Sequence, residues 1–501
     1  MRTSMERVFV ISGWVWIAIV LLWQLVAYWC FTIDDAYISF RYAQNLVNGN
    51  GLVYNVGERI EGYTNFLWVI LIAFLMKVGV PIPEGAKVVG LLALGLSLCL
   101  TYQIANHFTN QWAAILSVVF CVTYPHLIVA SIEGLETPLF ITFMLMLLWL
   151  LLRQTIHLSA AITIGITLAL LSMTRPDGFL FLIPTVVILC GASPNERKIT
   201  TLVIVTTLLF YGFYFIWRWH YYQQFLPNTF YAKGIATKYL LTRGINSLNR
   251  FFFDQVLPVT VLSVFTVIHR RRERSLQLFL WFVLIRSFFV LLSGEAWMGY
   301  YRFSTPMLPL LGILAADAIV MLHRELKQCN ASAYVTLPLF LAIFTILHGI
   351  EKSNKHHPMA QRYAIGLQQA HIRLGITLRR YAPKNSVLAC ADAGALPYYS
   401  GLTTIDIMGL TDRHIAHLPG RHWEKTDPTY ILIRRPNFIV LSSKTSPPSG
   451  FEPITNAFKV IYRSPIFQRE YILWKVYRFH DQYFLWVFVK KDCNLRREER
   501  D

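Results

Sequence analysis

Two adjoining stretches decide the class of fold: VFVISGWVWIAIVLLWQLVAYWCF at residues 8–31 and TIDDAYISFRY at residues 32–42. A membrane-spanning helix needs about 20 mainly apolar residues, and the first stretch meets that length. It is longer than the roughly 7–15-residue apolar core of a signal peptide, and no small-residue cleavage site precedes Asp34. We therefore expect a retained helix that delivers Asp34 and Asp35 to a membrane surface.

Composition indicates that most of the chain lies in a membrane. Of its 501 residues, 55% are hydrophobic and only 15% are charged, whereas a soluble protein carries about 25% charged residues. This composition excludes a soluble enzyme, a disordered chain and a fibrous protein. The sequence predicts an α-helical polytopic membrane protein.

Positive charge gathers in the C-terminal part of the chain. The net charge is +18, and residues 351–501 hold 23 Lys and Arg against 13 Asp and Glu, a net charge of +10. A basic segment beside a membrane favours anionic lipid, phosphate or acidic glycan as its partner. No nucleic acid is expected, because no basic amphipathic helix, RNA-binding motif or zinc-finger spacing occurs.

Apolar runs predict about eleven membrane-spanning helices within residues 1–350. Besides 8–31, the runs are 86–106, 112–131, 138–153, 158–174, 178–191, 201–219, 253–269, 276–293, 304–323 and 333–350. Basic loops face the cytoplasm, and HRRRER at 269–274 is the strongest such signal. With the N-terminus inside, this rule requires that the apolar run 66–80 lies along the outer leaflet. We therefore expect an outer loop at 32–85 with juxtamembrane helices.

The chain changes character after residue 350. Residues 351–501 are polar, and a linker is indicated at Glu351–Pro358. Short apolar runs typical of strands follow at Ser386–Ala391, Phe438–Leu441, Phe458–Tyr462 and Leu485–Val489. Two domains are therefore predicted: a transmembrane domain over 1–350 and a soluble α/β domain over 351–501 on the outer side.

The seven cysteines do not indicate a metal or redox centre. No two form a CxxC pair, and four lie in apolar runs, where cysteine behaves as a small hydrophobic residue. The sequence also lacks a P-loop, an HExxH zinc motif and a GxSxG hydrolase motif. We expect no metal site. A divalent cation is compatible with the chain, but no ligand cluster requires one.

Asp34 and Asp35 are the candidate catalytic residues. Adjacent carboxylates beside a low-dielectric medium repel each other, so one pKa should rise. A partly desolvated carboxylate suits a general base, which contributes about 10²–10⁴ in rate. The alternative is structural, because either aspartate could cap the helix that carries Arg41 and Tyr42.

Other polar residues of the predicted outer segments are candidates for substrate binding. Glu58 and Glu61 have the chemistry to orient a polyol, although a solvated Gly/Asn-rich loop explains the same pattern. Carboxylates before a helix that starts at Pro138 need no function, and aromatic residues such as Trp297 are often membrane anchors. The candidates are Arg41, Tyr42, Asn55, Glu58, Glu61, Tyr63, Asn65, Glu133, Glu136, Asn228, Lys233, Glu295, Trp297 and Tyr301.

Three arginines are candidates for binding an anionic group: Arg286, Arg175 and Arg302. Arg286 lies within a predicted span, where a charge costs at least about 2.5–3.5 kcal/mol. Either it pairs with Asp317 of the next predicted span, or it clamps a phosphate from the outer leaflet. The residues alone do not choose between these interpretations.

The motifs resemble those of a known family. Asp34–Tyr42 with GLVYNVGERIEGYTN at 51–65 is similar to the opening of the mycobacterial terminal arabinofuranosyltransferase AftB and its bacterial relatives. Similar later motifs are GLETP at 134–138, TRPDG at 174–178, LPNT at 226–229, Trp297 with YRF at 301–303, and IDIMGLTD at 405–412. These relatives are GT-C glycosyltransferases of the membrane, so the resemblance implies a GT-C fold.

The resemblance also implies a reaction. A polyprenyl-phosphate sugar would be the donor, and a glycan, lipid or protein would be the acceptor at the periplasmic face of the bacterial inner membrane. Asp34 would act as base on the acceptor hydroxyl, with Asp35 second, and Arg286, Arg175 or Arg302 would meet the donor phosphate. The chain departs from the family at Gly294-Glu295-Ala296-Trp297, where the relatives have Gly-Asp-Trp.

Two other functions are compatible with this sequence. A transporter or flippase for a lipid-linked sugar would show inverted repeats and broken helices near mid-bilayer, and neither pattern is visible. A non-catalytic envelope assembly protein could share the same fold. Asp34, Glu61 and Arg302 within their motifs favour the enzyme.

Overall fold

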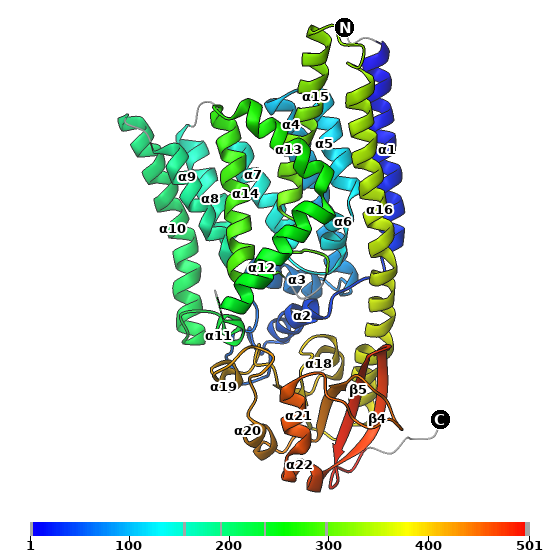
Figure 1. Ribbon diagram of the computed structural model, residues 1–501. Coiled ribbons are helices and arrows are strands. Elements are labelled where there is room, and N and C mark those ends of the chain that lie inside the picture. Colours follow the sequence, from blue (N-terminus) through cyan, green and yellow to red (C-terminus); the bar gives the residue numbers. More distant parts are fainter. Residues whose placement is uncertain (1–3, 154–156, 191–192, 235–236, 296–298, 496–501) are drawn as a thin grey trace. The chain divides into compact units, whose positions relative to one another are not determined.

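The computed structural model describes residues 4–153, 157–190, 193–234, 237–295 and 299–495 (Figure 1). The chain forms two compact units, and each contains three separate segments. The helical unit comprises residues 1–30, 86–215 and 235–359, and the mixed unit comprises residues 31–85, 216–234 and 360–501.

Helices build the described part of the helical unit. They are α1 (Ser4–Tyr28), α4 (Glu84–Phe108), α5 (Gln111–Thr123), α6 (Pro125–Ile132), α7 (Thr137–Leu151), α8 (Leu158–Thr174), η1 (Pro176–Phe181), α9 (Leu182–Leu189), α10 (Pro194–Tyr222), α12 (Lys238–Arg250), η2 (Phe251–Gln255), α13 (Leu257–Arg270), α14 (Arg274–Ser293), α15 (Met307–Gln328) and α16 (Thr336–Leu367). Of these, α4 begins in a segment of the mixed unit, and α10 and α16 continue into segments of it.

Long apolar helices make the chain a multi-pass membrane protein. Five helices of the described residues are long and apolar enough to cross a bilayer: Val10–Tyr28, α4, α10, α14 and α15. Two bent pairs raise the number to seven if each pair is one span: α5 with α6, bent by 63°, and Lys238–Gln255 with α13, bent by 93°. Shorter apolar helices, among them α7 and α8, accompany these spans. The count of about eleven stays a prediction.

The helix α15 forms the core of the helical unit. All its residues from Met307 to Val320 are buried. Two side chains of α13 donate hydrogen bonds to its backbone: Ser263 to the Leu311 carbonyl (2.9 Å) and Thr266 to the Leu314 carbonyl (2.8 Å). Small hydroxyl residues let helices approach closely where no water is present to satisfy polar groups.

The mixed unit contains a five-stranded sheet with the order β2-β1-β3-β5-β4. The strands are β1 (Val387–Cys390), β2 (Thr403–Asp406), β3 (Phe438–Ser443), β4 (Tyr471–His480) and β5 (Tyr483–Lys490). The strand β1 is parallel to β2 and β3, whereas β5 is antiparallel to β3 and β4. The predicted α/β domain is thereby confirmed.

Helices complete the C-terminal segment of the mixed unit. They are η3 (Gln368–Ile372), α17 (Arg373–Tyr381), α18 (Ala395–Ser400), α19 (Arg413–Ala416), α20 (Pro428–Ile433), α21 (Asn456–Arg463) and α22 (Pro465–Glu470). The strand predicted at Phe458–Tyr462 is wrong, because α21 covers it. Thr455 caps this helix by accepting the Phe458 N–H, and Phe458 and Ile461 bury one face at helical spacing.

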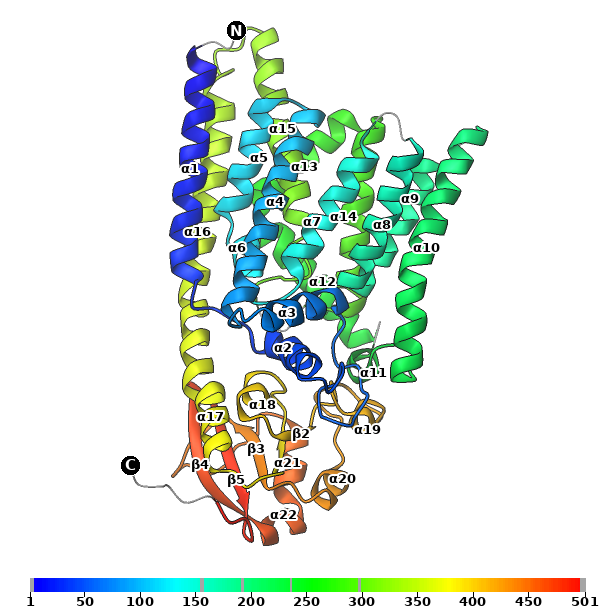
Figure 2. The ribbon, with the colours of Figure 1, turned by 180° about the vertical axis from the view of Figure 1, so that it is seen from behind.

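The loop after α1 belongs to the mixed unit. It forms α2 (Asp34–Val47) and α3 (Phe66–Lys77), and the segment 216–234 adds α11 (Asn228–Lys233). The helix α2 packs against α3 and α18 (Figure 2). Because α3 has 12 residues, it extends about 18 Å, too short for a hydrocarbon core of about 30 Å. This length agrees with the prediction that the run 66–80 does not cross the membrane.

The sequence indicated a linker at Glu351–Pro358, but these residues are helical. The helix α16 runs through them without a break, with Pro358 inside it. The apolar residues before 351 already form a helix. Adding a residue to an existing helix costs less free energy than starting a new one, so the helix extends through the polar residues. The boundary predicted at residue 350 therefore lies within α16, and the two units divide after Met359.

Candidate functional site

Asp34 is the first residue of α2 and is buried in the mixed unit, with 8% of its surface exposed. Its backbone N–H donates to the Tyr363 hydroxyl (3.0 Å), and its Oδ1 accepts the Ala395 N–H (2.8 Å). Gly394 lies so close that a Cβ there would overlap the backbone oxygen and Oδ2 of Asp34. The turn after β1 therefore closes on the predicted base.

A histidine and a second carboxylate lie behind this turn. His371 Nε2 is 3.0 Å from Asp392 Oδ2, and the Tyr483 hydroxyl donates to both Asp392 oxygens (3.2 and 3.0 Å). Burial raises the pKa of Asp34 from 3.8 to about 6, while His371 lowers it and Asp392 raises it by smaller amounts. Burial lowers the pKa of His371, but Asp392 and Asp34 more than offset this and leave it raised. His371 lies in none of the motifs that indicated function in the sequence.

The capping interpretation of the Asp34–Asp35 pair is wrong. The N-cap of α2 is Ile33, and no side chain makes a capping hydrogen bond there. Both aspartates lie in the first turn, where negative charge is favourable. Asp34 is buried and Asp35 is half-buried, so the two carboxylates have different environments.

Arg41 connects the loop to the C-terminal segment of the same unit. Its guanidinium donates to the carbonyls of Tyr54 (2.8 Å), Pro397 (2.7 Å) and Leu402 (2.7 Å), and to Asn55 Oδ1 (3.1 Å). Because its donors are used within the protein, this predicted substrate residue has a structural role in the described geometry.

Other predicted loop residues also form internal hydrogen bonds. Glu61 pairs with Arg218 (2.7 Å), a residue outside the motifs that the sequence pointed to. Burial raises the pKa of Glu61 to about 7 against the opposing effect of Arg218. The remaining contacts are Tyr42 to the Ile60 carbonyl (2.6 Å), Tyr63 to Tyr222 (3.1 Å), Asn65 to Ser39 (3.1 Å), and Asn228 to the carbonyls of Gly409, Leu410 and Asp412. Lys233 lies in the last turn of α11.

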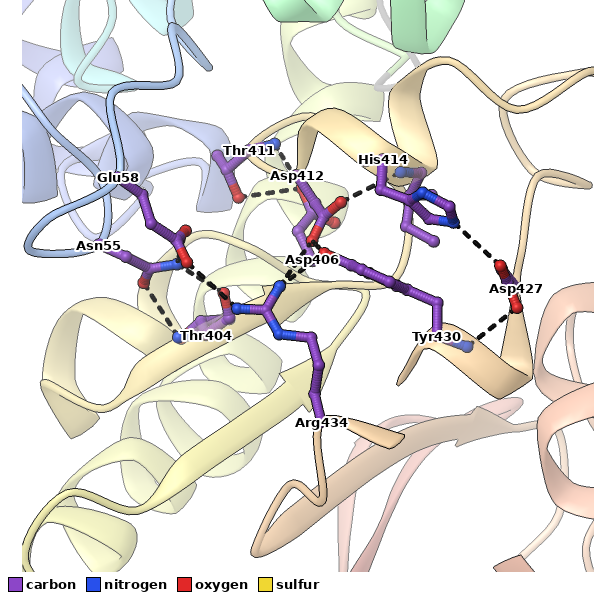
Figure 3. Close-up of polar contacts among 12 residues, drawn as sticks. Asn55, Glu58, Thr404, Asp406, Thr411, Asp412, His414, Asp427, Tyr430 and Arg434 are labelled. Carbon is purple, nitrogen blue, oxygen red and sulfur yellow. Dashed lines mark hydrogen bonds and ion pairs between the residues drawn. The ribbon is translucent and has the colours of Figure 1, made fainter. Parts of the chain in front are cut away.

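The IDIMGLTD motif builds a polar cluster (Figure 3). Asp406 accepts the N–H groups of Met408 (2.9 Å) and Thr411 (2.8 Å), and burial raises its pKa to about 6 against these hydrogen bonds. Arg434 lies 3.5 Å from Asp412 and 3.1 Å from Glu58. His414 pairs with Asp427 (2.9 Å) and Tyr430 donates to Asp412 (2.9 Å). These pairings attach the loop carrying Glu58 to the sheet domain.

The helical unit contains two of the candidate arginines in one buried ion network. Arg175 pairs with Glu136 (2.9 Å) and with Asp177 Oδ1 (3.0 Å), and Arg286 pairs with Asp177 Oδ2. Arg286 also donates to the Phe303 carbonyl (2.6 Å). Two positive and two negative charges therefore balance within this network.

The predicted pairing of Arg286 with Asp317 is wrong. Asp317 instead pairs with Arg270 (2.8 Å) and accepts the Thr109 hydroxyl (2.5 Å). Rise per residue predicts the depth of a side chain along a helix but not the direction in which it points around the axis. Asp177, the actual partner of Arg286, lies in the short η1 helix, outside the two predicted spans that contain Arg286 and Asp317.

The other predicted residues of the helical unit that the structure describes are Glu133, after α6, and Glu295, Tyr301 and Arg302, in the segment before α15. Glu295 accepts the Phe303 N–H and the Ser304 hydroxyl (both 2.6 Å), which gives it a structural role. Glu133 accepts the Thr137 hydroxyl (3.2 Å). The described residues contain no carboxylate paired with Arg302, and its buried Nε has no hydrogen-bond partner among them. Tyr301 adopts a positive φ of 55°, and Trp297 lies outside the described residues.

Within the described ranges, no three His, Cys, Asp or Glu side chains are grouped so that they could hold a metal ion. Carboxylates of both units are instead engaged singly or in pairs, Glu136 with Arg175, Glu61 with Arg218 and Asp34 with the Ala395 N–H.

Comparisons with known proteins define the class of fold. Residues 360–489 match a family model described as "Domain of unknown function (DUF8728)". The sequence matches none of the curated proteins. The structure is similar to ArnT from Cupriavidus metallidurans bound to undecaprenyl phosphate, with a TM-score of 0.62 and 13% identity over 95% of this chain and 98% of that chain.

Two further solved structures are similar. One is the oligosaccharyltransferase AglB from Archaeoglobus fulgidus in complex with an inhibitory peptide and a dolichol-phosphate (TM-score 0.55, 10% identity, 87% of this chain, 70% of that chain). The other is the arabinofuranosyltransferase AftD from mycobacteria (TM-score 0.50, 11% identity, 95% and 41%). These neighbours are GT-C glycosyltransferases, and the chain has the GT-C fold with a C-terminal sheet domain.

Replacing Gly394 by Ala should destabilise the mixed unit. The added methyl group would overlap Asp34, and such overpacking costs about 1–3 kcal/mol. Thermal unfolding of the purified protein would measure the loss. Gly95→Ala is the matched control, because no atom lies within 4 Å of a Cβ there. An unchanged melting temperature for Gly394→Ala would contradict the close contact.

Replacing Asp177 by Asn should destabilise the helical unit. Arg175 and Arg286 would lose their shared counter-charge, and breaking a buried ion pair costs about 3–5 kcal/mol. The control is Glu452→Gln, whose partner Lys444 is 53% exposed, so little change is expected. Equal melting temperatures for Asp177→Asn and wild type would show that the arginines do not depend on Asp177.

Proposed function

We propose that the protein transfers a sugar from a polyprenyl-phosphate donor to an acceptor hydroxyl. The GT-C fold supports this class of reaction. The donor sugar would be a pentose such as arabinofuranose or a hexose, and the acceptor an envelope glycan, lipid or protein. The reaction would take place at the periplasmic face of a bacterial inner membrane, with the N-terminus cytoplasmic. From the sequence motifs we also propose that the chain is related to AftB or to the Legionella membrane protein LphB.

One observation carries the proposal: the state of the Asp34 carboxylate. Oδ1 is held by the Ala395 N–H, whereas no hydrogen bond to Oδ2 forms among the described residues. Burial raises the pKa of this carboxyl to about 6, near the pH at which a base is most effective in a neutral compartment. These features support our assignment of Asp34 as general base, with Asp35 as the second candidate.

The chemistry follows from this assignment. Asp34 takes the proton of the acceptor hydroxyl while the hydroxyl oxygen bonds to the anomeric carbon. The bond between that carbon and the phosphate oxygen breaks, and polyprenyl phosphate leaves with the electron pair. A positive group must offset the charge that develops on the phosphate.

Arg302 is the arginine that we assign to the donor phosphate. Arg175 and Arg286 are already paired with carboxylates, so a phosphate would have to compete for them. Arg302 has no such pair among the described residues. Arginine binds phosphate through charge-assisted hydrogen bonds that a guanidinium presents in a fork.

The Asp34→Asn variant should lose transferase activity by about 10²–10⁴-fold. The amide keeps an oxygen for the Ala395 N–H but cannot take a proton. Activity is measured as release of polyprenyl phosphate from a panel of synthetic polyprenyl-phosphate sugars, with and without envelope glycan extract. Asp427→Asn, in the polar cluster of Figure 3, is the control and should retain activity.

The other outcomes of this assay are equally specific. Equal turnover by Asp34→Asn with loss in Asp35→Asn would move the base to Asp35. Donor binding without release from any sugar of the panel would reject the transferase and favour a flippase or an assembly protein.

The transferase rate should rise with pH through about 6, the pKa of Asp34, because a base must be deprotonated. His371→Gln should move this rise to higher pH, since His371 lowers the pKa of Asp34. The kcat/KM of both proteins as a function of pH tests this. His414→Gln, in the cluster around Asp427, should leave the profile in place. A profile that His371→Gln leaves unchanged would contradict the assignment of Asp34.

A further inference from the structure

A basic groove lies in the mixed unit between the helical segment η3–α17 and the edge strand β4. Its volume is about 700 Å³, within the roughly 300–1,000 Å³ typical of pockets for small ligands. Arg373 and Arg380 line it from α17, and Lys475 and Arg478 line it from β4. None of these residues belongs to the site around Asp34.

Helical spacing places the lining residues on one face. Gln369, Arg373, Thr377 and Arg380 recur at intervals of three or four residues and face the groove. The opposite face carries Ala370, Leu374 and Leu378, which are buried against the sheet. The helix therefore turns its apolar side to the core and its cations to the groove.

Most of the positive charge in the groove has no counter-charge. Arg478 pairs with Asp481. By contrast, Arg373, Arg380 and Lys475 form no ion pair within the described part of the chain. Lys475 lies over two rings, 4.9 Å from the centroid of Trp474 and 5.9 Å from that of Tyr381. Like charges gathered in a concave site focus the field and attract anions.

Protection of an edge strand does not account for this arrangement. Charged side chains and bulges on an edge strand prevent pairing with another sheet, and β4 has both Lys475 and an irregular register beside it. That explanation covers the strand but not the arginines of α17, which reach the same groove from the other wall.

The neutral lining favours a sugar over a lipid surface. Gln369 contributes an amide that can exchange hydrogen bonds with sugar hydroxyls. The Thr377 hydroxyl donates to the Arg373 carbonyl (2.8 Å) and accepts from the Tyr477 hydroxyl (3.4 Å), so it can offer a sugar only an acceptor. The rings of Tyr381 and Tyr477 add apolar surface with a polar edge. A membrane would meet a flat basic face better than a groove with walls.

We propose that the groove between α17 and β4 binds an anionic saccharide, one that carries carboxylate or phosphate groups. Arg373 and Arg380 bind the anionic groups from one wall, and Lys475 binds them from the other. The ligand needs no transfer reaction to bind, so the proposal stands apart from the role of Asp34.

Binding of a labelled oligogalacturonate to the full-length protein in detergent tests the groove. A neutral malto-oligosaccharide of the same length and vesicles of phosphatidylglycerol or phosphatidylcholine are the comparison ligands. We expect saturable binding of the oligogalacturonate that weakens with salt. The double variant Arg373→Gln/Arg380→Gln should weaken it by at least about tenfold, since it removes two charged hydrogen-bond donors from one wall.

The matched control is Arg379→Gln, an exposed arginine of α17 that does not line the groove. It should change the affinity by less than about twofold. If the double variant does not fold, as judged by its melting temperature, Lys475→Gln on the opposite wall provides the same measurement.

Three results would overturn the proposal. Equal loss of binding in Arg379→Gln would show attraction by overall charge rather than by the groove. Equal affinity for the neutral oligosaccharide would show that the cations do not select the ligand. Binding to phosphatidylglycerol vesicles without binding to the oligogalacturonate would assign this face to a membrane surface. None of these results depends on transferase activity.

Discussion

The hydrogen bond from the Ala395 N–H to Asp34 Oδ1 joins residues 361 positions apart in the chain. It is the contact on which the candidate site depends. Because Gly394 has no side chain, the turn after β1 can reach the carboxylate directly. The backbone amide holds one oxygen, and burial raises the pKa of the carboxyl to about 6. A loop at one end of the chain and a turn near the other thereby define one chemical environment.

The sequence predicts those features that depend on composition and local spacing. It predicts the membrane class, the position of Asp34 after the first apolar helix, and the sheet domain. It does not predict partners that lie far apart in the chain. Asp177 as the partner of Arg286, Arg218 as that of Glu61, and His371 beside Asp392 all come from contacts that periodicity cannot detect. The run at Phe458–Tyr462 is short and apolar, and the cap at Thr455 and the spacing of Phe458 and Ile461 favour a helix over a strand.

Charge is handled differently in the two units. In the helical unit, Arg175, Arg286, Glu136 and Asp177 neutralise one another where desolvation is most costly. In the C-terminal segment of the mixed unit, Arg373, Arg380 and Lys475 stay uncompensated beside water. Other cations of this segment, such as Arg434 and Lys490, form ion pairs. The unpaired cations of the groove contribute to the positive net charge of residues 351–501.

Arg41 carries a consequence for biosynthesis. Its guanidinium bonds to the carbonyls of Pro397 and Leu402, which the ribosome adds some 350 residues later. Until then Arg41 and Asp34 in the loop 31–85 stay in contact with water, because charged groups are buried only when their partners are present. The mixed unit therefore closes only after synthesis is nearly finished. Residues 360–489, although they match one family model, would lack part of their hydrogen-bonded surface if produced without the earlier segments.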